Sequence, residues 1–460
     1  MKLLKPLLHA KSKPLPQLRF EDQQLSSFSG LLILIPLFKR LNLERRLEAC
    51  FQSITRSHLY SYGLLSKLLL IHIILGYRQL KDINAYHDDP VVAQVLGQER
   101  LPSAPTLSRM LAHIDGASID QVHELNRQLV LDRLSQLGLR RITLDFDGTV
   151  LTTRRHAQGS AIGFNRQKRG HRSYYPLCCH VAQSGQLLDL RHRSGNVHDS
   201  AQAIEFVQSC LQAVRAALPG VLIEARFDSA FYTEKLLQQL EQWQVQYTIS
   251  VPFTCHQGLR QKVHQRRWWW RLRGGQGRVD YFEERWKPKR WKRKGRLIFV
   301  RHERPVIRKG PLQLDLFEPR DWDYEYQVVV TNKKEGAAHI ARFHQGRGNQ
   351  EKVLGQLKSE GAMDYVPARR WNANKLYLMV NVMAHNLGRE LQMELTPPAA
   401  RQGRQRAPLW TFEGWEVLRR ELIQRAGRLI RPQGRLTLSM SCNQKVQSYF
   451  RRFLPSHQFT

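Results

Sequence analysis

Apolar residues recur at helical spacing through about the first 140 residues of the chain. The stretches LLILIPLFKRLNLERRLEACF, GLLSKLLLIHIILG and SIDQVHELNRQLVLDRLSQLG place apolar side chains three or four positions apart, as one face of a helix requires. No run in this part alternates in the manner of a strand. The pattern predicts an all-helical domain over residues 1–140.

Within that domain, the stretch LPSAPTLSRMLAHI follows VVAQVLG, which ends at Gly97. Its two prolines break a helix, and Ser103 or Thr106 can cap the next one, so helix, turn and helix are expected. Two interpretations remain open. The segment is either general helix packing or a helix-turn-helix that places Arg109 in the major groove of DNA.

The pattern changes at Arg141 to the alternation typical of a strand. In RITLDFDGTVLTT, apolar side chains at Ile142 and Phe146 face one side, while Asp145 and Asp147 face the other. Two carboxylates are therefore expected on one face of this strand.

Further strands and helices follow in a regular order up to residue 251. The runs SYYPLCCHVAQ and QLLDLRHR form a hairpin across Ser184-Gly185, followed by a helix over about 200–217, the strand VLIEARFD, a helix over about 233–243 and the strand VQYTISV. This order predicts a mixed sheet with helices on its faces. His192 and His198 flank a predicted loop and are expected at the polar surface, with a metal role as the alternative.

Residues 252–332 are basic and aromatic, and RLIFVRHER and YEYQVVVTN alternate like strands, so we expect a β-rich insertion. The tryptophans at 268–270, with Trp269 in the middle, either form the core of this part or stack on DNA bases. The run RWKPKRWKRKGR is expected to contact the DNA backbone. Its residues assigned to that contact are Lys289, Arg290, Lys292 and Arg293.

Helical sequence resumes over residues 333–395, and residues 396–460 form a basic, weakly patterned C-terminal region that we expect to be helical. In HQGRGNQEKVLGQLK, the spacing puts Arg347, Glu351 and Lys358 on one stripe of a helix. A solvated pair between Arg347 and Glu351 explains part of this pattern. A functional site is the alternative.

Charge composition points to a polyanionic partner. The 460 residues include 72 lysines and arginines against 39 aspartates and glutamates, for a net charge of +33. Such an excess repels itself unless it is neutralised, and nucleic acid is the expected partner. The length predicts two or three domains.

The sequence carries no sign of a membrane span or of export. The apolar run at 63–76 is too short to cross a bilayer and contains Lys67 and His72. The six cysteines lack CxxC spacing, which argues against a zinc site or a disulfide framework, and Cys178 and Cys179 are expected as buried thiols. A cytoplasmic protein without a membrane partner is expected.

Three carboxylates far apart in the sequence are candidates for one site. Asp147 ends the first strand of the mixed sheet, and Asp228 ends VLIEARFD. If these strands are neighbours, the two carboxylates meet and need a cation between them, for which hard oxygen ligands select Mg²⁺ or Mn²⁺. Glu351 would be the third ligand, while Arg347 and Lys358 would neutralise phosphates.

These motifs resemble the DDE transposases of bacterial insertion sequences, in the branch marked by a Y-(2)-R-(3)-E-(6)-K signature. Arg347, Glu351 and Lys358 match that spacing, LDFDGT matches the first-aspartate strand, and RFDSAFY matches the second-aspartate motif. A later helix, WNANKLYLMVNVMAHNLGRE, is also similar. The resemblance covers about residues 141–390, with a weaker likeness in the helical N-terminal domain, residues 1–140, which is expected to bind the DNA of the transposon ends.

The resemblance implies an RNase H-like catalytic domain in an α/β chain, interrupted by the β-rich insertion and completed by residues 333–395. It implies catalysis by Asp147, Asp228 and Glu351 with two Mg²⁺ or Mn²⁺ ions, and Asp145 is the alternative first ligand. Histidine stands at 344 where the signature has tyrosine, and a contact with DNA phosphate is expected there.

The implied activity is cleavage at transposon ends followed by strand transfer into target DNA. Its partners would be the terminal inverted repeats, target DNA and a second copy of the chain in a synaptic dimer. Two alternatives remain: a metal-dependent nuclease of the same fold that does not join strands, and an inactive DNA-binding protein descended from a transposase.

Overall fold

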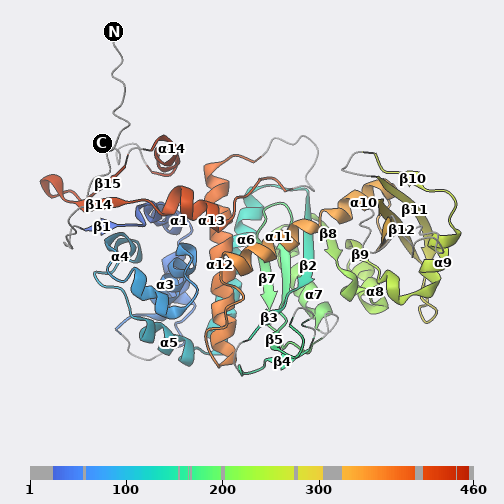
Figure 1. Ribbon diagram of the computed structural model, residues 1–460, viewed down its shortest axis with the longest axis horizontal. Coiled ribbons are helices and arrows are strands. Elements are labelled where there is room, and N and C mark those ends of the chain that lie inside the picture. Colours follow the sequence, from blue (N-terminus) through green and yellow to red (C-terminus); the bar gives the residue numbers. More distant parts are fainter. Residues whose placement is uncertain are drawn as a thin grey trace, which may run out of the picture.

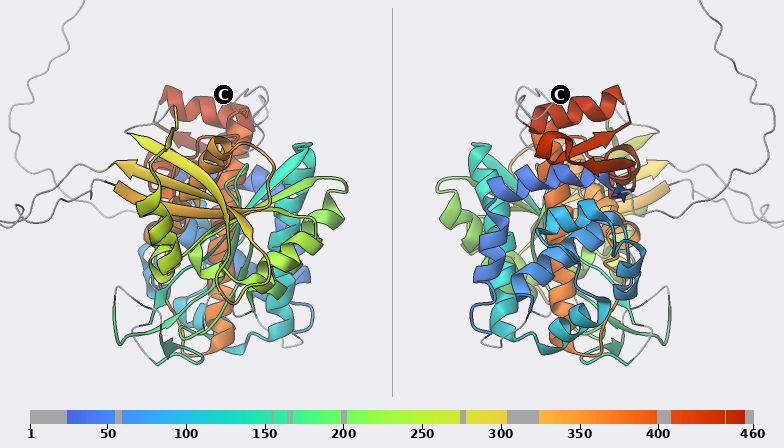
Figure 2. Two further views of the ribbon diagram at one scale, coloured as in Figure 1. Left: turned by 90° about the vertical axis from the view of Figure 1, so that its right-hand side faces the viewer. Right: turned by 90° about the vertical axis from the view of Figure 1, so that its left-hand side faces the viewer.

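The protein is arranged in three parts along its longest axis (Figure 1). The computed structural model describes residues 24–54, 59–153, 156–163, 165, 168–197, 202–273, 278–303, 324–398, 408–441 and 443–454. N-terminal helices lie at one end, a mixed sheet occupies the centre, and the inserted strands lie at the other end. Figure 2 shows these two ends face on, with the C-terminal elements along one side.

The N-terminal part is helical, as the apolar spacing predicts. Its helix α3 is buried on nearly all sides and ends at Gly76, whose φ of 97° suits glycine. No helix among the described residues has both the length and the apolar character needed to cross a membrane. The helices are η1 (Ser29–Ile33), α1 (Leu34–Arg40), α2 (Leu43–Ala49), α3 (Tyr62–Leu75), η2 (Leu80–Ala85), α4 (Pro90–Leu96), α5 (Ala104–His113) and α6 (Gly116–Gln136).

The predicted order of helix, turn and helix is present at α4 and α5. Gly97 ends α4 with φ 78°, and Ser103 is the N-cap residue of α5. Arg109 lies exposed on α5, and its guanidinium donates to the Thr106 hydroxyl at 3.3 Å. An exposed side chain is available for DNA contact, which stays a prediction.

A nine-stranded mixed sheet forms the centre, in the order β10-β11-β12-β13-β9-β8-β2-β6-β7. Strand β2 pairs antiparallel with β6 and parallel with β8, and β8 is parallel to β9. The predicted succession of strands and helices is confirmed. Its elements are β2 (Arg141–Gly148), β6 (Leu177–Val181), β7 (Leu187–Arg191), α7 (Ala203–Ala217), β8 (Leu222–Phe227), α8 (Glu234–Gln242) and β9 (Gln246–Ser250).

The two faces of β2 differ as the alternation predicts. Ile142 and Phe146 are fully buried in an apolar core that also contains side chains of α7 and α8. On the other face, Asp145 is fully buried as well, because the helices α10 (Ala337–Gln345), α11 (Gly348–Ser359) and α12 (Trp371–Leu395) lie over that side (Figure 1).

The segment between β2 and β6 adds a small three-stranded sheet, and the predicted run SYYPLCCHVAQ is divided between β5 and β6. The added strands are β3 (Leu151–Thr152), β4 (Ala161–Ile162) and β5 (Arg172–Tyr174). His192 is buried, with its ring centre 4.3 Å from those of Tyr174 and Trp371, so the expected surface position is wrong. His198 lies outside the described residues.

The insertion extends the central sheet, because β13 pairs antiparallel with β9. Trp269 is half-buried, packing edge-on against Phe282 at 4.6 Å with the Arg301 guanidinium 4.5 Å over its ring. The core interpretation therefore describes Trp269, whereas Trp268 and Trp270 are exposed. The elements are η4 (Phe253–Cys255), α9 (Gln257–Gln265), β10 (Trp270–Arg271), β11 (Val279–Trp286), β12 (Gly295–Glu303) and β13 (Tyr324–Thr331).

Helix α12 runs between the N-terminal helices and the sheet (Figure 1), and almost all of its residues are buried. The C-terminal region contains a hairpin as well as the expected helices, and the hairpin pairs with the short strand β1 near the start of the chain. Its weak hydrophobic pattern follows from the partial exposure of both strands. These elements are β1 (Leu25–Ser26), α13 (Trp415–Leu418), η6 (Arg419–Ile423), β14 (Gly427–Ile430), η7 (Pro432–Gly434), β15 (Thr437–Met440) and α14 (Gln444–Phe453).

Candidate active site

Asp147 and Asp228 lie at the same edge of the sheet on neighbouring parallel strands. The last pair in the register of β2 and β8 joins Phe146 to Phe227, and each aspartate directly follows one member of that pair. Adjacent strands are about 4.8 Å apart, so the two aspartates are neighbours. Because side chains alternate along a strand, both continue the face that carries Asp145 and Arg226.

Backbone amides orient both carboxylates. Asp147 accepts a hydrogen bond from the amide of Gly148 at 2.9 Å. Asp228 is the N-cap residue of η3 (Ser229–Phe231) and accepts from the amide of Ala230 at 2.9 Å. The turn that ends β8 thus fixes the position of the second carboxylate.

Arg347 connects the sheet to the helix that carries Glu351. Its Nη1 donates to Asp147 Oδ2 at 3.2 Å, and its Nη2 donates to Glu351 Oε1 at 3.1 Å. The Asp147 and Arg347 side chains are 14% and 17% exposed, whereas that of Glu351 is 65% exposed. The expected Arg347–Glu351 pair is therefore present, but the same guanidinium also binds the carboxylate on β2.

Lys358, which follows Glu351 on the same stripe of α11, is half-buried. Burial lowers the pKa of its ammonium group, while the nearby Cys178 and the carboxylate of Asp147 act in the opposite direction. The third member of the predicted stripe therefore adds positive charge on the Asp147 side of the helix.

Asp145 is held by an internal ion pair. Arg226 donates from Nη2 to Asp145 Oδ2 at 2.7 Å and from Nε to Oδ1. Burial opposes ionisation of this carboxyl, but the Arg226 guanidinium and His180 outweigh it and keep the pKa of Asp145 below its ordinary value. With both oxygens occupied inside the protein, Asp145 is less suited than Asp147 to be the first ligand.

The structure places His344 inside the protein, where its side chain is not exposed for the expected contact with DNA phosphate. It is 1% exposed, with Nδ1 2.9 Å from the Thr248 hydroxyl and Nε2 2.8 Å from the Ser250 hydroxyl. Burial, together with the charges of Arg347 and Arg226, lowers the pKa of His344 to about 3, so the ring is neutral at ordinary pH. Both ring nitrogens are thus hydrogen-bonded to hydroxyls on β9, and these bonds attach α10 to the sheet.

Two residues that the sequence patterns did not single out also fasten this helix pair. Arg226 donates from Nη1 to the carbonyl of Phe343 at 2.8 Å, and the Gln350 side chain donates to the carbonyl of Asp145 at 3.1 Å. The alternation in RFDSAFY carries a signal for the first, because Arg226 is two positions from Asp228 and so shares its face. No local signal identifies the partner of Gln350.

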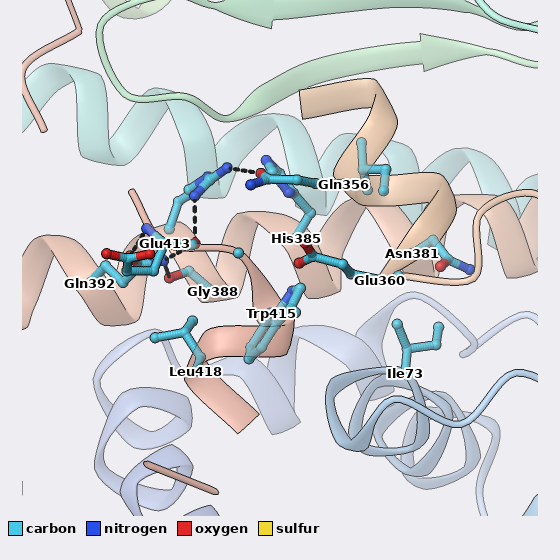
Figure 3. A pocket seen from close by; sticks show the side chains of 14 residues that line it. Ile73, Gln356, Glu360, Asn381, His385, Gly388, Gln392, Glu413, Trp415 and Leu418 are labelled. Atoms are coloured by element: carbon cyan, nitrogen blue, oxygen red, sulfur yellow. Dashed lines mark hydrogen bonds between the residues drawn. The ribbon is translucent and has the colours of Figure 1, made fainter. Parts of the chain in front are cut away.

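The far end of α11 is held by α12 and the C-terminal segment around a small cavity of about 10 Å³ (Figure 3). Arg389 on α12 donates to the Gln356 side chain at 2.8 Å and to the carbonyl of Glu413 at 3.1 Å. A cavity of this size holds about one water molecule. It is therefore part of the support of α11 and too small for a substrate.

The donor set suits a hard divalent cation, although the carboxylates are bridged by a guanidinium here. Among the residues that the structure describes, no three histidine, cysteine, aspartate or glutamate side chains are arranged to hold a metal ion. Carboxylate oxygens are the ligands that Mg²⁺ and Mn²⁺ prefer. Arg347 supplies positive charge between Asp147 and Glu351.

The basic turn, residues 287–294 between β11 and β12, lies against α8 and the residue Tyr232 that precedes it. Trp291 in this turn packs on Tyr232 with ring centres 4.5 Å apart, and Tyr232 directly follows η3, which Asp228 caps. The assigned residues Lys289, Arg290, Lys292 and Arg293 are all exposed. Arg109 is not part of this group, since α5 lies at the other end of the molecule (Figure 1).

A family model described as transposase DDE domain, group 1, matches residues 9–458. The chain belongs to this family. The predicted resemblance of the chain to DDE transposases is thereby confirmed, and the match extends over nearly the whole chain.

Comparison with solved structures finds transposases. The piggyBac transposase synaptic complex with hairpin DNA is 10% identical with a TM-score of 0.44, covering 86% of this chain and 79% of that one. The Mos1 transposase paired-end complex with the left transposon end is 11% identical with a TM-score of 0.18, covering 42% and 59%. The Mos1 mariner paired-end complex with Mn gives the same identity and score, covering 42% and 60%. A search of curated proteins finds no match.

Proposed function

We propose that this DDE family member is a DNA transposase that cleaves transposon ends and transfers the freed strand into target DNA, with Mg²⁺ or Mn²⁺ bound by Asp147, Asp228 and Glu351. The observation that carries the proposal is the placement of Asp147 and Asp228 on adjacent parallel strands with Arg347 joining Asp147 to Glu351. Family membership supports the reaction class.

The catalytic core is proposed to be RNase H-like. In support, β7, β6 and β2 form an antiparallel group that continues through the parallel strands β8 and β9. The proposal places the catalytic aspartates at the ends of its first and fourth strands, β2 and β8. The insertion then enters after β9 and returns to it through β13.

Each residue of the proposed site has a physical task. Asp147, Asp228 and Glu351 would hold the divalent cation, which would supply Lewis-acid activation of the attacking oxygen and charge stabilisation of the leaving oxygen. Asp147 and Asp228 are held by backbone amides, while the exposed Glu351 side chain can change its rotamer without disturbing the core. Arg347 and Lys358 hold positive charge where phosphates approach.

The DNA path is proposed to run from the basic turn toward the carboxylates. Lys289 and Arg290 bind backbone phosphates beside α8, and the exposed Trp268 and Trp270 are the rings of the triplet available to stack on bases. Arg109 on α5 belongs to a separate end-binding surface. Synapsis of two ends is proposed to take place in a dimer.

The test uses duplex DNA that carries the sequences flanking the gene as donor, a supercoiled plasmid as target, and Mg²⁺ or Mn²⁺. We expect nicking at the repeat ends and joined donor-target products from the wild-type protein. Asp147→Asn, Asp228→Asn and Glu351→Gln are each expected to lose nicking by at least about a hundredfold while still binding donor DNA. Lys352→Gln, an exposed neighbour of Glu351, is the matched control and is expected to react normally.

The two alternatives give different results in the same assay. A nuclease without strand transfer yields metal-dependent nicks but no joined product, even with donor ends that are already cleaved. An inactive DNA-binding descendant yields a donor complex and neither product. If the three carboxylate variants nick as well as the wild-type protein, the assignment of the site is wrong whichever activity is found.

A further inference from the structure

A buried arginine connects the aspartate strands to the junction of α10 and α11, and the glutamate helix begins at this junction. Arg226 stands on β8 two positions before Asp228 and opposite Asp145 in the register with β2. Its side chain is 4% exposed. One guanidinium therefore sits between the two strands that end in Asp147 and Asp228.

Every nitrogen of this guanidinium has a partner. Nε and Nη2 form a two-point pair with the Asp145 carboxylate, and Nη1 donates to the carbonyl of Phe343 at 2.8 Å. The group also lies 5.1 Å from the centre of the Phe343 ring. Lysine cannot replace this group, because its donors all lie on one nitrogen, whereas the planar guanidinium donates from three nitrogens to separate acceptors.

Glycine at position 346 makes room for this contact. A Cβ atom built on Gly346 would lie 2.2 Å from Nη1 of Arg226. The φ of Gly346 is −58°, an ordinary helical value, so space and not backbone freedom requires glycine here. Arg347 directly follows Gly346. The close contact between Arg226 and Gly346 therefore fixes the backbone position from which the Arg347 side chain starts.

We infer that Arg226 is a positioning residue that, fixed by Asp145, sets the α10–α11 junction and thereby holds Arg347 and Glu351 over Asp147. The inference rests on the proposed function, because the geometry that it explains is that of the proposed carboxylate site. Neither Arg226 nor Asp145 needs to touch DNA or metal in this role. The two aspartates of LDFDGT are thus assigned different tasks.

The first test adds a methyl group at the junction. Gly346→Ala is expected to raise the Mn²⁺ concentration for half-maximal nicking and to lower the nicking rate, each by about 10–100-fold, the range seen when supports of metal ligands are lost. Gly355→Ala is the matched control, because this exposed glycine lies further along α11 and a Cβ added there would meet no neighbouring atom within 4 Å. It is expected to behave like the wild-type protein.

The second test removes the arginine and its partner together. In the double variant Arg226→Met and Asp145→Leu no buried charge is left unpaired, so the protein is expected to fold. It should bind donor DNA normally but need about 10–100-fold more Mn²⁺. In this background Gly346→Ala should cause much less further loss, since the contact of 2.2 Å with Arg226 Nη1 is gone and only the contact of 3.2 Å with the Phe343 carbonyl oxygen is left. Arg226→Lys, which keeps the charge, should also be defective.

Three results would overturn the inference. They are a double variant with the wild-type Mn²⁺ requirement, a Gly346→Ala effect of equal size in both backgrounds, and an Arg226→Lys protein that is fully active. Failure of the proposed function looks different, because then the wild-type protein itself shows no metal-dependent nicking or Glu351→Gln leaves nicking unchanged. Direct Mn²⁺ titration by electron paramagnetic resonance supplies the metal affinity without relying on activity.

Discussion

Arg347 donates to Asp147 at 3.2 Å and to Glu351 at 3.1 Å, so one guanidinium bridges two of the three proposed metal ligands. The guanidinium carries one positive charge, so it offsets part of the negative charge of the two carboxylates. The same residue must give up these contacts when a divalent cation takes their place. It can then pair with phosphate, which a guanidinium binds in the same two-point manner.

Replacing Arg347 is therefore expected to affect metal and DNA in opposite directions. Arg347→Gln removes a competing ion pair worth about 1 kcal/mol, which corresponds to roughly fivefold tighter Mn²⁺ binding by the DNA-free protein. Donor DNA should bind more weakly, and nicking should fall. Mn²⁺ titration by electron paramagnetic resonance checks the first effect, with Lys352→Gln as a control for the loss of one charge. Unchanged or weaker Mn²⁺ binding would contradict the bridging role.

Replacing the two aspartates of β2 by asparagine, one at a time, is expected to change the free energy of unfolding by different amounts. Asp145→Asn leaves the Arg226 guanidinium buried without its anion, a loss of about 3–5 kcal/mol in the free energy of unfolding. Asp147→Asn should change that free energy by about 1 kcal/mol or less, because its partner Arg347 is partly exposed. Urea denaturation measures both. Equal losses in the two variants would show that the assignment of separate roles is mistaken.

The basic turn is expected to contribute phosphate contacts. Replacing Lys289 and Arg290 together by alanine should reduce the slope of log K against log salt by about 2, close to 0.9 for each contact. Lys39→Ala with Arg45→Ala, on exposed positions of α1 and α2, removes the same charge at the far end of the molecule. Fluorescence anisotropy from 50 to 300 mM salt, roughly the usual working range, reads the slopes. If the slope of the Lys289 and Arg290 variant equals that of the control variant, the DNA does not contact the basic turn.

His192 is expected to make stability depend on pH. Burial lowers its pKa to about 3, so the folded protein holds the neutral ring while the unfolded chain takes up a proton near pH 6.5. Its stabilising effect is complete above pH 6.5 and decreases by about 1.4 kcal/mol for each unit below that value. His192→Phe keeps a ring between Tyr174 and Trp371 and should flatten the pH dependence by that amount. Urea denaturation at pH 7.5 and 5.5 tests this, and parallel curves would refute it.

Local sequence patterns were sufficient to predict the strands that lead to Asp147 and Asp228 and the face that these residues share. The period-2 alternation around Asp147 and the breaks after Asp228 depend only on neighbouring residues, and the observed strands follow them closely. The offset from Arg347 to Glu351 likewise predicted a pair that forms. Such relations need no knowledge of the rest of the fold.

Relations between distant segments were not predictable in the same way. His344 lies in a polar-looking stretch, yet Thr248 and Ser250 satisfy both ring nitrogens from another strand. The role of Arg226 depends on the register of two strands and on a glycine far along the chain. The join between the insertion and the central sheet depends on the pairing of β13 with β9. Each requires tertiary contacts that no local pattern records.

The most direct test of the central claim is an anomalous-difference map from crystals of the protein with donor DNA and Mn²⁺. We expect manganese peaks bound by carboxylate oxygens of Asp147, Asp228 and Glu351, with Arg347 turned to a phosphate. Manganese held by other residues, or Arg347 still bridging Asp147 and Glu351 in a crystal whose DNA is cleaved, would contradict the account.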